Sequence, residues 1–417
     1  MVYKRRIVDS QLAELLNIAG FVVIEGPKAV GKTETAKQQA ASVLQLDMDF
    51  NARESARITP ATVLNEKAPL LIDEWQLVPE LWSHVKVAVD TRQLRGQFIL
   101  TGLAVPQDDI TRDSAAGRVA RLKMRPMSLF ESGESSGAVS IRNLFTRKFE
   151  ASRGPDITIA HIAELTCRGG WPRNLELSNV QARKLMKSYV EELAAVDLQR
   201  VTGIKYNNSN VLKVMNSLAR NVGTKASDTV IGKDAGSNGV PIDRKIVAGY
   251  LDALSRVMVT ENNPPWTPNM RSRNRINGSA TRYFIDPSIA TAAMGASPQT
   301  LMKGEIQYLG FLFENLAIRD LRIYMQAIGG SVKQYRDSSG LEVDVILETD
   351  ENEWAAIEIK LGFNYINQAA ENLLNFKEKV DVKTSGEPAF LAIVTATGHA
   401  YQRADGIYVL PIGTLRP

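Results

Sequence analysis

The sequence predicts an α/β fold organised around a phosphate-binding loop, and three observations favour this fold. A short apolar, β-branched run at 21–24 is typical of a buried strand, and the residues shortly after it fit the pattern G-x-x-x-x-G-K-[ST]. Two later apolar runs, at 69–72 and 97–100, end in polar residues, at the strand ends where open parallel sheets bind ligands. Alternating strands and an amphipathic helix then predict a second α/β module over 296–417.

The phosphate loop lies between the first predicted strand and a predicted helix over 33–46. Its residues are the candidate nucleotide ligands: Gly26, Pro27, Lys28, Ala29, Val30, Gly31, Lys32 and Thr33. The free N–H groups and the dipole of a helix N-terminus favour an anion at this position. We therefore expect Lys32 to reach the β- and γ-phosphates of ATP and Thr33 to hold Mg²⁺. The alternative is a glycine-containing turn that fits the pattern by chance.

Length, composition and charge are those of an ordinary globular protein. The 417 residues are too many for one core, so roughly two to four domains are expected. Apolar residues make up 44% and charged residues 23%, and the net charge of +4 neither requires nor excludes a nucleic-acid partner. No run approaches the length of a membrane span, and the basic stretch 1–6 lacks the apolar core of a signal peptide. We expect a cytoplasmic protein without a membrane partner.

Cysteine and histidine argue against a zinc site. The single cysteine, Cys167, excludes an intramolecular disulfide and a site built from several cysteines. The three histidines, His84, His161 and His399, lie far apart in the sequence, so each is interpreted as structural.

Polar residues that could act on ATP follow the later strands. A helix is predicted over 10–18 and a second strand over 46–49. Asp73 and Glu74 end the next strand, where Asp73 would orient a Mg²⁺-bound water and Glu74 would polarise the attacking water. Thr101 ends a further strand and could sense the γ-phosphate or position water. The alternative for Asp73 and Glu74 is that they only form an acidic exit from the strand into a loop. The alternative for Thr101 is that it only caps its strand.

Two arginines after this strand could stabilise charge in the transition state. Arg118, or alternatively Arg121, could do so from the same chain or from a neighbouring subunit in an ATP-dependent assembly. Exposed structural arginines are the alternative.

Residues 1–135 resemble a family of prokaryotic AAA-type ATPases. The resemblance rests on the segments 71–79 (LIDEWQLVP), 98–102 (FILTG), 117–118 (GR) and 125–129 (RPMSL). It implies an ATPase core over 1–135, with Thr101 at the sensor position of the family. The residue at position 103 is leucine, whereas the family usually has serine there, which weakens a polar role at 103 and leaves that of Thr101 intact.

A helical lid is predicted over 136–206, and a loop at 131–139 that is rich in Ser, Gly and Glu leads into it. Helices are expected at 159–166 and 181–198, separated by the turn Gly169-Gly170-Trp171-Pro172. The family has a Gly-Gly-aromatic-Pro turn in its lid, and related ATPases contact the base with a Gly-x-Pro turn. Pro172 is therefore a candidate adenine contact, and a plain turn between helices is the equal alternative.

A winged-helix module is predicted over 207–295. Helices are expected at 211–219 and 242–254, turn residues lie over 228–239, and strand-like runs lie at 258–259 and 282–285. Arg271, Arg273 and Arg275 alternate, so they would share one strand face that could contact the phosphates of DNA or RNA. A solvated wing is the alternative.

The module over 296–417 carries a second group of candidate residues. A hairpin of strands at 341–347 and 354–360, turning at 349–352, would bring Asp344, Glu358 and Lys360 to one edge. Two carboxylates can hold Mg²⁺ and a lysine can position water. An amphipathic hairpin with a charged face is the alternative. The stretch resembles nucleases of the PD-(D/E)xK type, in which Glu314 matches an additional helical acid, and the same ATPase family commonly carries such a domain.

These features predict an ATP- and Mg²⁺-dependent ATPase that couples its nucleotide state to a nuclease-like domain acting on nucleic acid. The alternative is an ATP-gated switch or adaptor whose nuclease-like domain is inactive. A small-molecule phosphotransferase is disfavoured, because no acceptor pocket can be identified and a winged helix would have no role in it.

Overall fold

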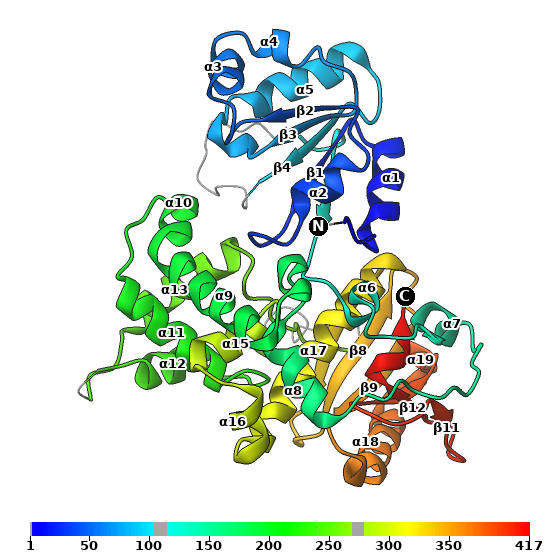
Figure 1. The fold of residues 1–417 in the computed structure, drawn as a ribbon. Coiled ribbons are helices and arrows are strands. Elements are labelled where there is room, and N and C mark those ends of the chain that lie inside the picture. Colours follow the sequence, from blue (N-terminus) through cyan, green and yellow to red (C-terminus); the bar gives the residue numbers. More distant parts are fainter. Residues whose placement is uncertain (1, 103–114, 238, 269–278) are drawn as a thin grey trace. The chain divides into compact units, whose positions relative to one another are not determined.

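The computed structural model describes residues 2–102, 115–237, 239–268 and 279–417 (Figure 1). The chain divides into two compact units. The first unit comprises Met1–Arg125, Val196–Lys205 and Ala253–Met258, and the second comprises Pro126–Ala195, Tyr206–Asp252 and Val259–Pro417. Among the described residues, no helix has both the length and the apolar character needed to cross a membrane.

The first unit is built on a parallel sheet with the strand order β2-β3-β4-β1-β5. Its elements are α1 (Val8–Ile18), β1 (Phe21–Glu25), α2 (Lys32–Lys37), β2 (Ser42–Gln45), α3 (Phe50–Ile58), α4 (Pro60–Val63), β3 (Leu70–Asp73), the 3₁₀ turn η1 (Trp75–Leu77), α5 (Leu81–Arg92), β4 (Phe98–Thr101), β5 (Val119–Lys123) and α10 (Leu198–Thr202). In Figure 1, α5 covers one face of this sheet and α1 and α2 lie on the other. The sheet contains the strands predicted around the phosphate loop and at 69–72 and 97–100.

Apolar strands and an aromatic helix face form the core of the first unit. Phe21 and Val23 on β1 pack in one buried cluster with Trp82 and Val85 on α5. The rings of Phe21 and Trp82 meet edge to face, with centroids 5.4 Å apart. Residues alternate between the two sides of a strand, so Val22 and Ile24 face the opposite side and are also fully buried. This burial on both faces explains the continuous apolar run in the sequence.

The helix predicted over 33–46 is wrong beyond its first turns. α2 ends at Lys37, and β2 follows at Ser42–Gln45. The segment 46–49, predicted as a strand, forms a turn in which Asp49 caps α3 by accepting from the Ala52 N–H. A short apolar run fits a helix and a strand equally well, and its pairing with β3 decides the outcome.

The second unit contains a helical part and a six-stranded mixed sheet. Its elements are α6 (Leu129–Ser132), β6 (Val139–Ser140), α7 (Ile141–Phe145), α8 (Ile159–Arg168), η2 (Pro172–Glu176), α9 (Asn179–Glu192), α11 (Asn208–Arg220), α12 (Asp228–Asp234), α15 (Pro287–Met294), α16 (Pro298–Lys303), α17 (Ile306–Ala327), β7 (Gly330–Arg336), β8 (Glu342–Thr349), β9 (Trp354–Lys360), η4 (Phe363–Tyr365), α18 (Ile366–Lys379), α19 (Val382–Ser385), β10 (Leu391–Thr395), β11 (Tyr401–Gln402), β12 (Tyr408–Pro411), η5 (Ile412–Thr414) and β13 (Leu415–Arg416). The π-helical turn η3 (Leu193–Asp197) and α13 (Arg244–Arg256) cross the division between the units.

The six-stranded sheet has the order β11-β12-β10-β9-β8-β7. β7, β8 and β9 are antiparallel, whereas β9, β10 and β12 run parallel. α18 packs on this sheet, with Ala369 and Phe376 in one buried cluster with Trp354 and Ala356 of β9. The predicted hairpin at 341–360 and the helix containing Glu314 are thereby confirmed as secondary structure.

Within the stretch 228–239, where turn residues were expected, residues 228–234 form the helix α12. Ser227 caps α12 by accepting from the Val230 N–H. Gly232 lies inside this helix because its neighbours leave no room for a side chain: a Cβ there would lie 2.4 Å from the Ile242 carbonyl oxygen. Beyond α13, the antiparallel bridges Thr260↔Phe284 and Asn263↔Thr281 join the two described segments near 269–278.

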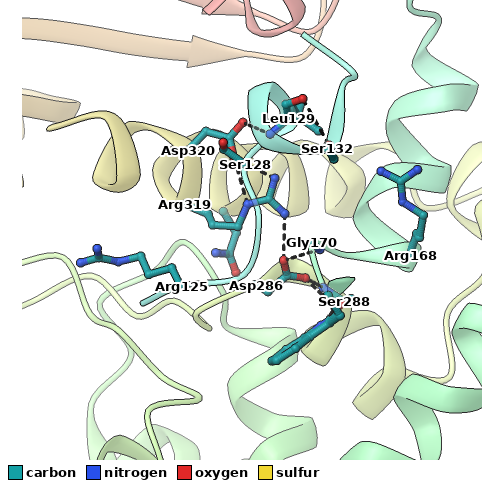
Figure 2. Close-up of polar contacts among 12 residues, drawn as sticks. Arg125, Ser128, Leu129, Ser132, Arg168, Gly170, Asp286, Ser288, Arg319 and Asp320 are labelled. Carbon is teal, nitrogen blue, oxygen red and sulfur yellow. Dashed lines mark hydrogen bonds and ion pairs between the residues drawn. The ribbon is translucent and has the colours of Figure 1, made fainter. Parts of the chain in front are cut away.

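A buried ion triad ties four segments of the second unit together (Figure 2). Arg319 on α17 donates to Asp286 at 2.8 Å and to Asp320 at 2.7 Å, and all three side chains are at most 1% exposed. Asp286 also accepts from the Gly170 N–H, and Asp320 accepts from the Leu129 N–H, each at 2.9 Å. The turn at 169–172 is therefore held from within its own unit.

Candidate functional site

The phosphate loop connects the carboxyl end of β1 to the N-terminus of α2. Gly31 precedes α2 with φ 100°, and Ala29 has φ 62°, both in the left-handed region. A Cβ on Gly26 would lie 2.3 Å from the Met124 carbonyl oxygen, so only glycine fits there. The loop therefore leads into a helix N-terminus, and the binding of an anion by the N–H groups there stays a prediction.

Lys32 is buried inside the loop. Its Nζ donates to the carbonyl oxygens of Gly26 and Pro27, each at 2.9 Å. Burial lowers the pKa of Lys32 to about 8, while the negative charges of Glu74 and Asp73 oppose this shift. The ammonium group therefore has acidic neighbours at and just after the end of β3 and lies where a phosphate could replace its carbonyl partners.

Asp73 is the centre of a buried hydrogen-bond network at the end of β3. The Thr33 hydroxyl donates to its Oδ1 at 2.9 Å, and the Thr101 hydroxyl donates to the same oxygen. The register explains the second contact, because Asp73 pairs with Thr101 across β3 and β4. A hydroxyl and a carboxylate are hard oxygen ligands of the kind Mg²⁺ prefers, so this pair fits the metal that the loop implies.

Glu74 follows Asp73 in the left-handed conformation, with φ 54° and ψ 43°. Its carboxylate accepts from the Gln76 side-chain amide, and the other amide atom of Gln76, Oε1, is buried without a hydrogen-bond partner. Gly102 leaves room for this amide, since a Cβ there would lie 2.0 Å from Gln76 Oε1. Gln76 thus holds the expected catalytic carboxylate at the sheet end, a role that no motif predicted.

Arg118 lies at the wrong end of the sheet to act on a phosphate of its own chain. Its carbonyl accepts from Gly20 and Phe21 at the start of β1, whereas the phosphate loop follows the end of that strand, about 16 Å away at the usual rise per residue. Its side chain pairs with exposed Asp90 at 2.5 Å. Arg121, the alternative, pairs with Glu25. An action of Arg118 within one chain is therefore wrong, and an action from a neighbouring subunit stays a prediction.

Asp197 forms an ion pair with the phosphate loop, although no sequence pattern identified it as a site residue. Lys28 donates to its Oδ1 at 3.1 Å across 169 positions of sequence. The Asp197 side chain is 2% exposed, whereas that of Lys28 is 51% exposed. Both residues belong to the first unit. A sequence gap of this length carries no periodic signal, so only the structure could reveal this contact.

Asp344, Glu358 and Lys360 converge in the second unit, as the hairpin predicted. The Lys360 ammonium donates to Asp344 Oδ2 at 3.1 Å and to Glu358 Oε2 at 2.5 Å. Asp344 also accepts from the Ile359 N–H at 2.8 Å, and Glu358 accepts from Asn372 on α18 at 2.7 Å. The lysine therefore lies between the two carboxylates.

Glu314 on α17 lies in the electrostatic field of this cluster. Burial, reinforced by the charge of Asp344, raises the pKa of Glu314 to about 8, and Tyr283 donates a hydrogen bond to its carboxylate. The same two causes raise the pKa of Glu358 to about 8. A groove of about 510 Å³ opens beside them, and its lining includes Glu314, Lys360, Phe311 and Tyr365.

Several predicted site residues are not joined to these clusters. Arg271, Arg273 and Arg275 lie outside the described residues. Pro172 begins η2 in the second unit, so its contact with adenine stays a prediction. Within the described ranges, no group of three or more His, Cys, Asp and Glu side chains is arranged to hold a metal ion.

Comparisons with known proteins support the identity of the first unit's sheet domain. Residues 19–132 match the model of an AAA domain. Residues 159–300 and 309–415 match two domains of unknown function, DUF8612 and DUF4143. Residues 19–132 are accordingly an AAA-type P-loop ATPase domain, and the match at 309–415 assigns no activity to the acidic cluster.

Relatives of the whole chain are distant. Uncharacterized proteins of Mycobacterium bovis and Mycobacterium tuberculosis are each 22% identical over 99% of this chain and 84% of their own length. Among solved structures, a Walker-type ATPase of Pyrococcus abyssi is similar over 70% of this chain and 96% of its own, with 14% identity and a TM-score of 0.43. A signal-transduction ATPase with a tetratricopeptide repeat sensor from Pyrococcus horikoshii is similar over 77% of this chain and 48% of its own, with 13% identity and a TM-score of 0.20. Similarities this low carry no argument about function.

Proposed function

We propose that the chain is a Mg²⁺-dependent ATPase that couples its nucleotide state to the nuclease-like module of the second unit, which acts on nucleic acid. The observation that carries the ATPase assignment is the network of Thr33, Asp73 and Thr101 at the ends of three adjacent elements beside the phosphate loop. The carboxyl ends of the strands are where an open parallel sheet binds its ligand.

Each residue of the first site has a defined role in this proposal. The N–H groups of the loop and the Lys32 ammonium bind the phosphates. Thr33 and Asp73 hold Mg²⁺, which neutralises charge on the β- and γ-phosphates. Glu74, held by Gln76, accepts a hydrogen bond from the attacking water, and Thr101 keeps the Asp73 carboxylate oriented.

ATP hydrolysis by purified variants tests this assignment. Lys32→Ala is expected to lose nucleotide affinity, because it removes the phosphate contact. Glu74→Gln is expected to bind ATP normally and to lower kcat by about 10²-fold or more, since it removes the group that orients water. Glu80→Gln is the matched control, because Glu80 is exposed and makes no cap contact. Wild-type turnover by Glu74→Gln would refute the role of Glu74.

The nuclease assignment depends on the convergence of Asp344, Glu358 and Lys360. Two carboxylates and a lysine on one sheet edge can hold Mg²⁺ and position a water against a phosphodiester. Asp344→Asn should abolish Mg²⁺-dependent cleavage of single-stranded or plasmid DNA or of RNA and leave ATP hydrolysis intact. Asp350→Asn, in the exposed turn of the same hairpin, is the matched control. Cleavage that persists in Asp344→Asn would refute the assignment.

A second candidate function, an ATP-gated switch or adaptor, has its own support. Lys360 already pairs with both carboxylates, and no three-ligand metal group occurs among the described residues. In that case the module binds nucleic acid without cutting it. Binding of labelled DNA or RNA without cleavage in Mg²⁺ or Mn²⁺ would favour this candidate, and cleavage that depends on Asp344 would exclude it.

A further inference from the structure

The ion pair between Lys28 and Asp197 joins a variable position of the phosphate loop to a segment distant in sequence. The Asp197 carboxylate is almost fully buried, yet the Lys28 ammonium that pairs with it belongs to a side chain that is half exposed. A buried carboxylate is costly to leave unpaired, so this contact holds the segment that carries Asp197 against the loop. No motif or domain match explains why an acid should lie there.

Asp197 also lies within electrostatic reach of the phosphate-binding lysine. Its negative charge opposes the lowering of the Lys32 pKa that burial causes. A carboxylate so close to Lys28 and Lys32 would face the negative charge of a bound triphosphate. Lys28 can pair with Asp197 or turn toward the phosphates, and the two anions compete for it.

The backbone around Asp197 is unusual. It ends a five-residue π-helical turn, Leu193–Asp197, between α9 and α10. Single π turns inside helices are rare and are frequent at functional sites. The division between the two compact units also falls inside this turn, between Ala195 and Val196. A change at Asp197 therefore acts on one of the stretches of chain that connect the units.

We propose that Asp197 is a positioning residue that senses nucleotide: it holds Lys28 when the loop is empty and loses this partner when ATP binds. Release of the pair leaves a buried carboxylate unpaired, so the turn 193–197 and the following helix α10 rearrange. This inference rests on the proposed ATP binding and supplies the step by which nucleotide state reaches the second unit.

The test combines nucleotide titration with hydrogen exchange in the full chain. In the wild type, ATP with Mg²⁺ should speed amide exchange of peptides covering 193–202. In Asp197→Asn, exchange should already be fast without ATP and should no longer respond to it. ATP should bind this variant about fivefold more tightly or better, within the usual range of coupling between sites, because no carboxylate competes for Lys28. Glu192→Gln, an exposed acid beside the turn, is the control.

Lys28→Met keeps the proposal testable if Asp197→Asn misfolds, because the Lys28 side chain is half exposed and its loss leaves the Asp197 carboxylate without this partner, as ATP binding is proposed to do. It should also show fast exchange at 193–202 without ATP. If ATP binds the wild type but exchange at 193–202 neither responds to ATP nor changes in Lys28→Met, the proposal is wrong while the ATPase assignment stands. If the wild type does not bind ATP, both fail.

Discussion

Among single residues, Asp73 has a carboxylate that hydrogen bonds hold in place at the end of β3. Two hydroxyls, from Thr33 and Thr101, donate to one of its oxygens, and the residue is 4% exposed. Thr33 is also the proposed Mg²⁺ ligand, whereas Thr101 acts only through the carboxylate. Substitutions of the two threonines should therefore have different effects on ATP hydrolysis.

Thr101→Val should lower kcat for ATP about tenfold and change KM little. The substitution keeps the volume but removes one hydrogen bond to a buried charge, which is worth roughly 1.5–3 kcal/mol. Thr101→Ser restores the donor and should recover most of the rate. Steady-state ATPase kinetics measure both, and a Thr101→Val enzyme with wild-type kcat would show that Thr101 only caps its strand.

His161 provides a stability effect that depends on pH. It contacts Glu134 at 3.0 Å and Glu164 at 3.2 Å, and Arg168 also pairs with Glu134. The hydrogen bond to Glu134 raises the pKa of His161 above 6.5, and the hydrogen bond from His161 lowers the pKa of Glu134 to about 2. The contribution of His161 to folding stability is thus present below pH 6.5 and is lost as pH rises through its raised pKa. The contribution of Glu134 to folding stability is present above pH 4.5 and is lost as pH falls toward 2.

We therefore expect His161→Gln to lower thermal stability most between about pH 4.5 and 6.5, where both contributions are present. The difference from wild type should shrink as pH rises through the raised pKa of His161. Melting curves across this pH range measure it, with exposed His84→Gln as the control. A difference that does not depend on pH would mean that the ion pair with Glu134 does not form in solution.

At the scale of elements, the buried triad around Arg319 decides how the helices of the second unit are tied together. It links α17 to the starts of α6 and α15 and to the turn that contains Gly170 (Figure 2). The Trp171 indole adds a hydrogen bond to Ser288 at 2.9 Å. These contacts give the Gly-Gly-Trp-Pro turn a structural role, whether or not Pro172 also contacts adenine.

Arg319→Met should destabilise the second unit by about 3–5 kcal/mol, because it leaves two buried carboxylates without their cation. Native-state hydrogen exchange of peptides from α17 measures the loss, and peptides from β3 in the first unit serve as an internal reference. Arg336→Met removes an exposed pair with Glu342 and should cost about 1 kcal/mol or less. Equal effects of the two substitutions would contradict the importance of the triad.

At the scale of the whole molecule, the net charge is close to neutral, so the binding of nucleic acid has to depend on local clusters of positive charge. The alternating arginines Arg271, Arg273 and Arg275 are the candidates in the sequence, although they lie outside the described residues. Replacing all three by alanine should weaken binding of duplex DNA at every sequence. The log–log slope of affinity against salt should fall by about 0.9 for each phosphate that the variant no longer neutralises. Titrations at several salt concentrations measure this slope, with exposed Arg153→Ala as the control. An unchanged slope would mean that the three arginines do not touch the backbone of DNA.

Local pattern alone determined the phosphate loop, β1, β3 and β4, and the hairpin that carries Asp344 and Glu358. In these stretches the period of the apolar residues and the neighbouring polar residues favour the same structure, so propensity and tertiary packing agree. Sequence reasoning was wrong at β2, because a run as short as Val43-Leu44 fits the helical period and the strand period equally well. It was also wrong at α12, where Gly232 signals a turn but is needed for close packing against Ile242.

Only the tertiary structure decided which distant residues meet. The direction of β5 in the parallel sheet places Arg118 at the end opposite to the phosphate loop, and the chain's return to the first unit at 196–205 brings Asp197 to Lys28. Lys360 was predicted to join Asp344 and Glu358, but its place between the two carboxylates depends on the packing of β8, β9 and α18. The periodicity of a sequence reports on neighbours within an element, whereas contacts across 169 positions follow from how buried surfaces and paired charges are satisfied together.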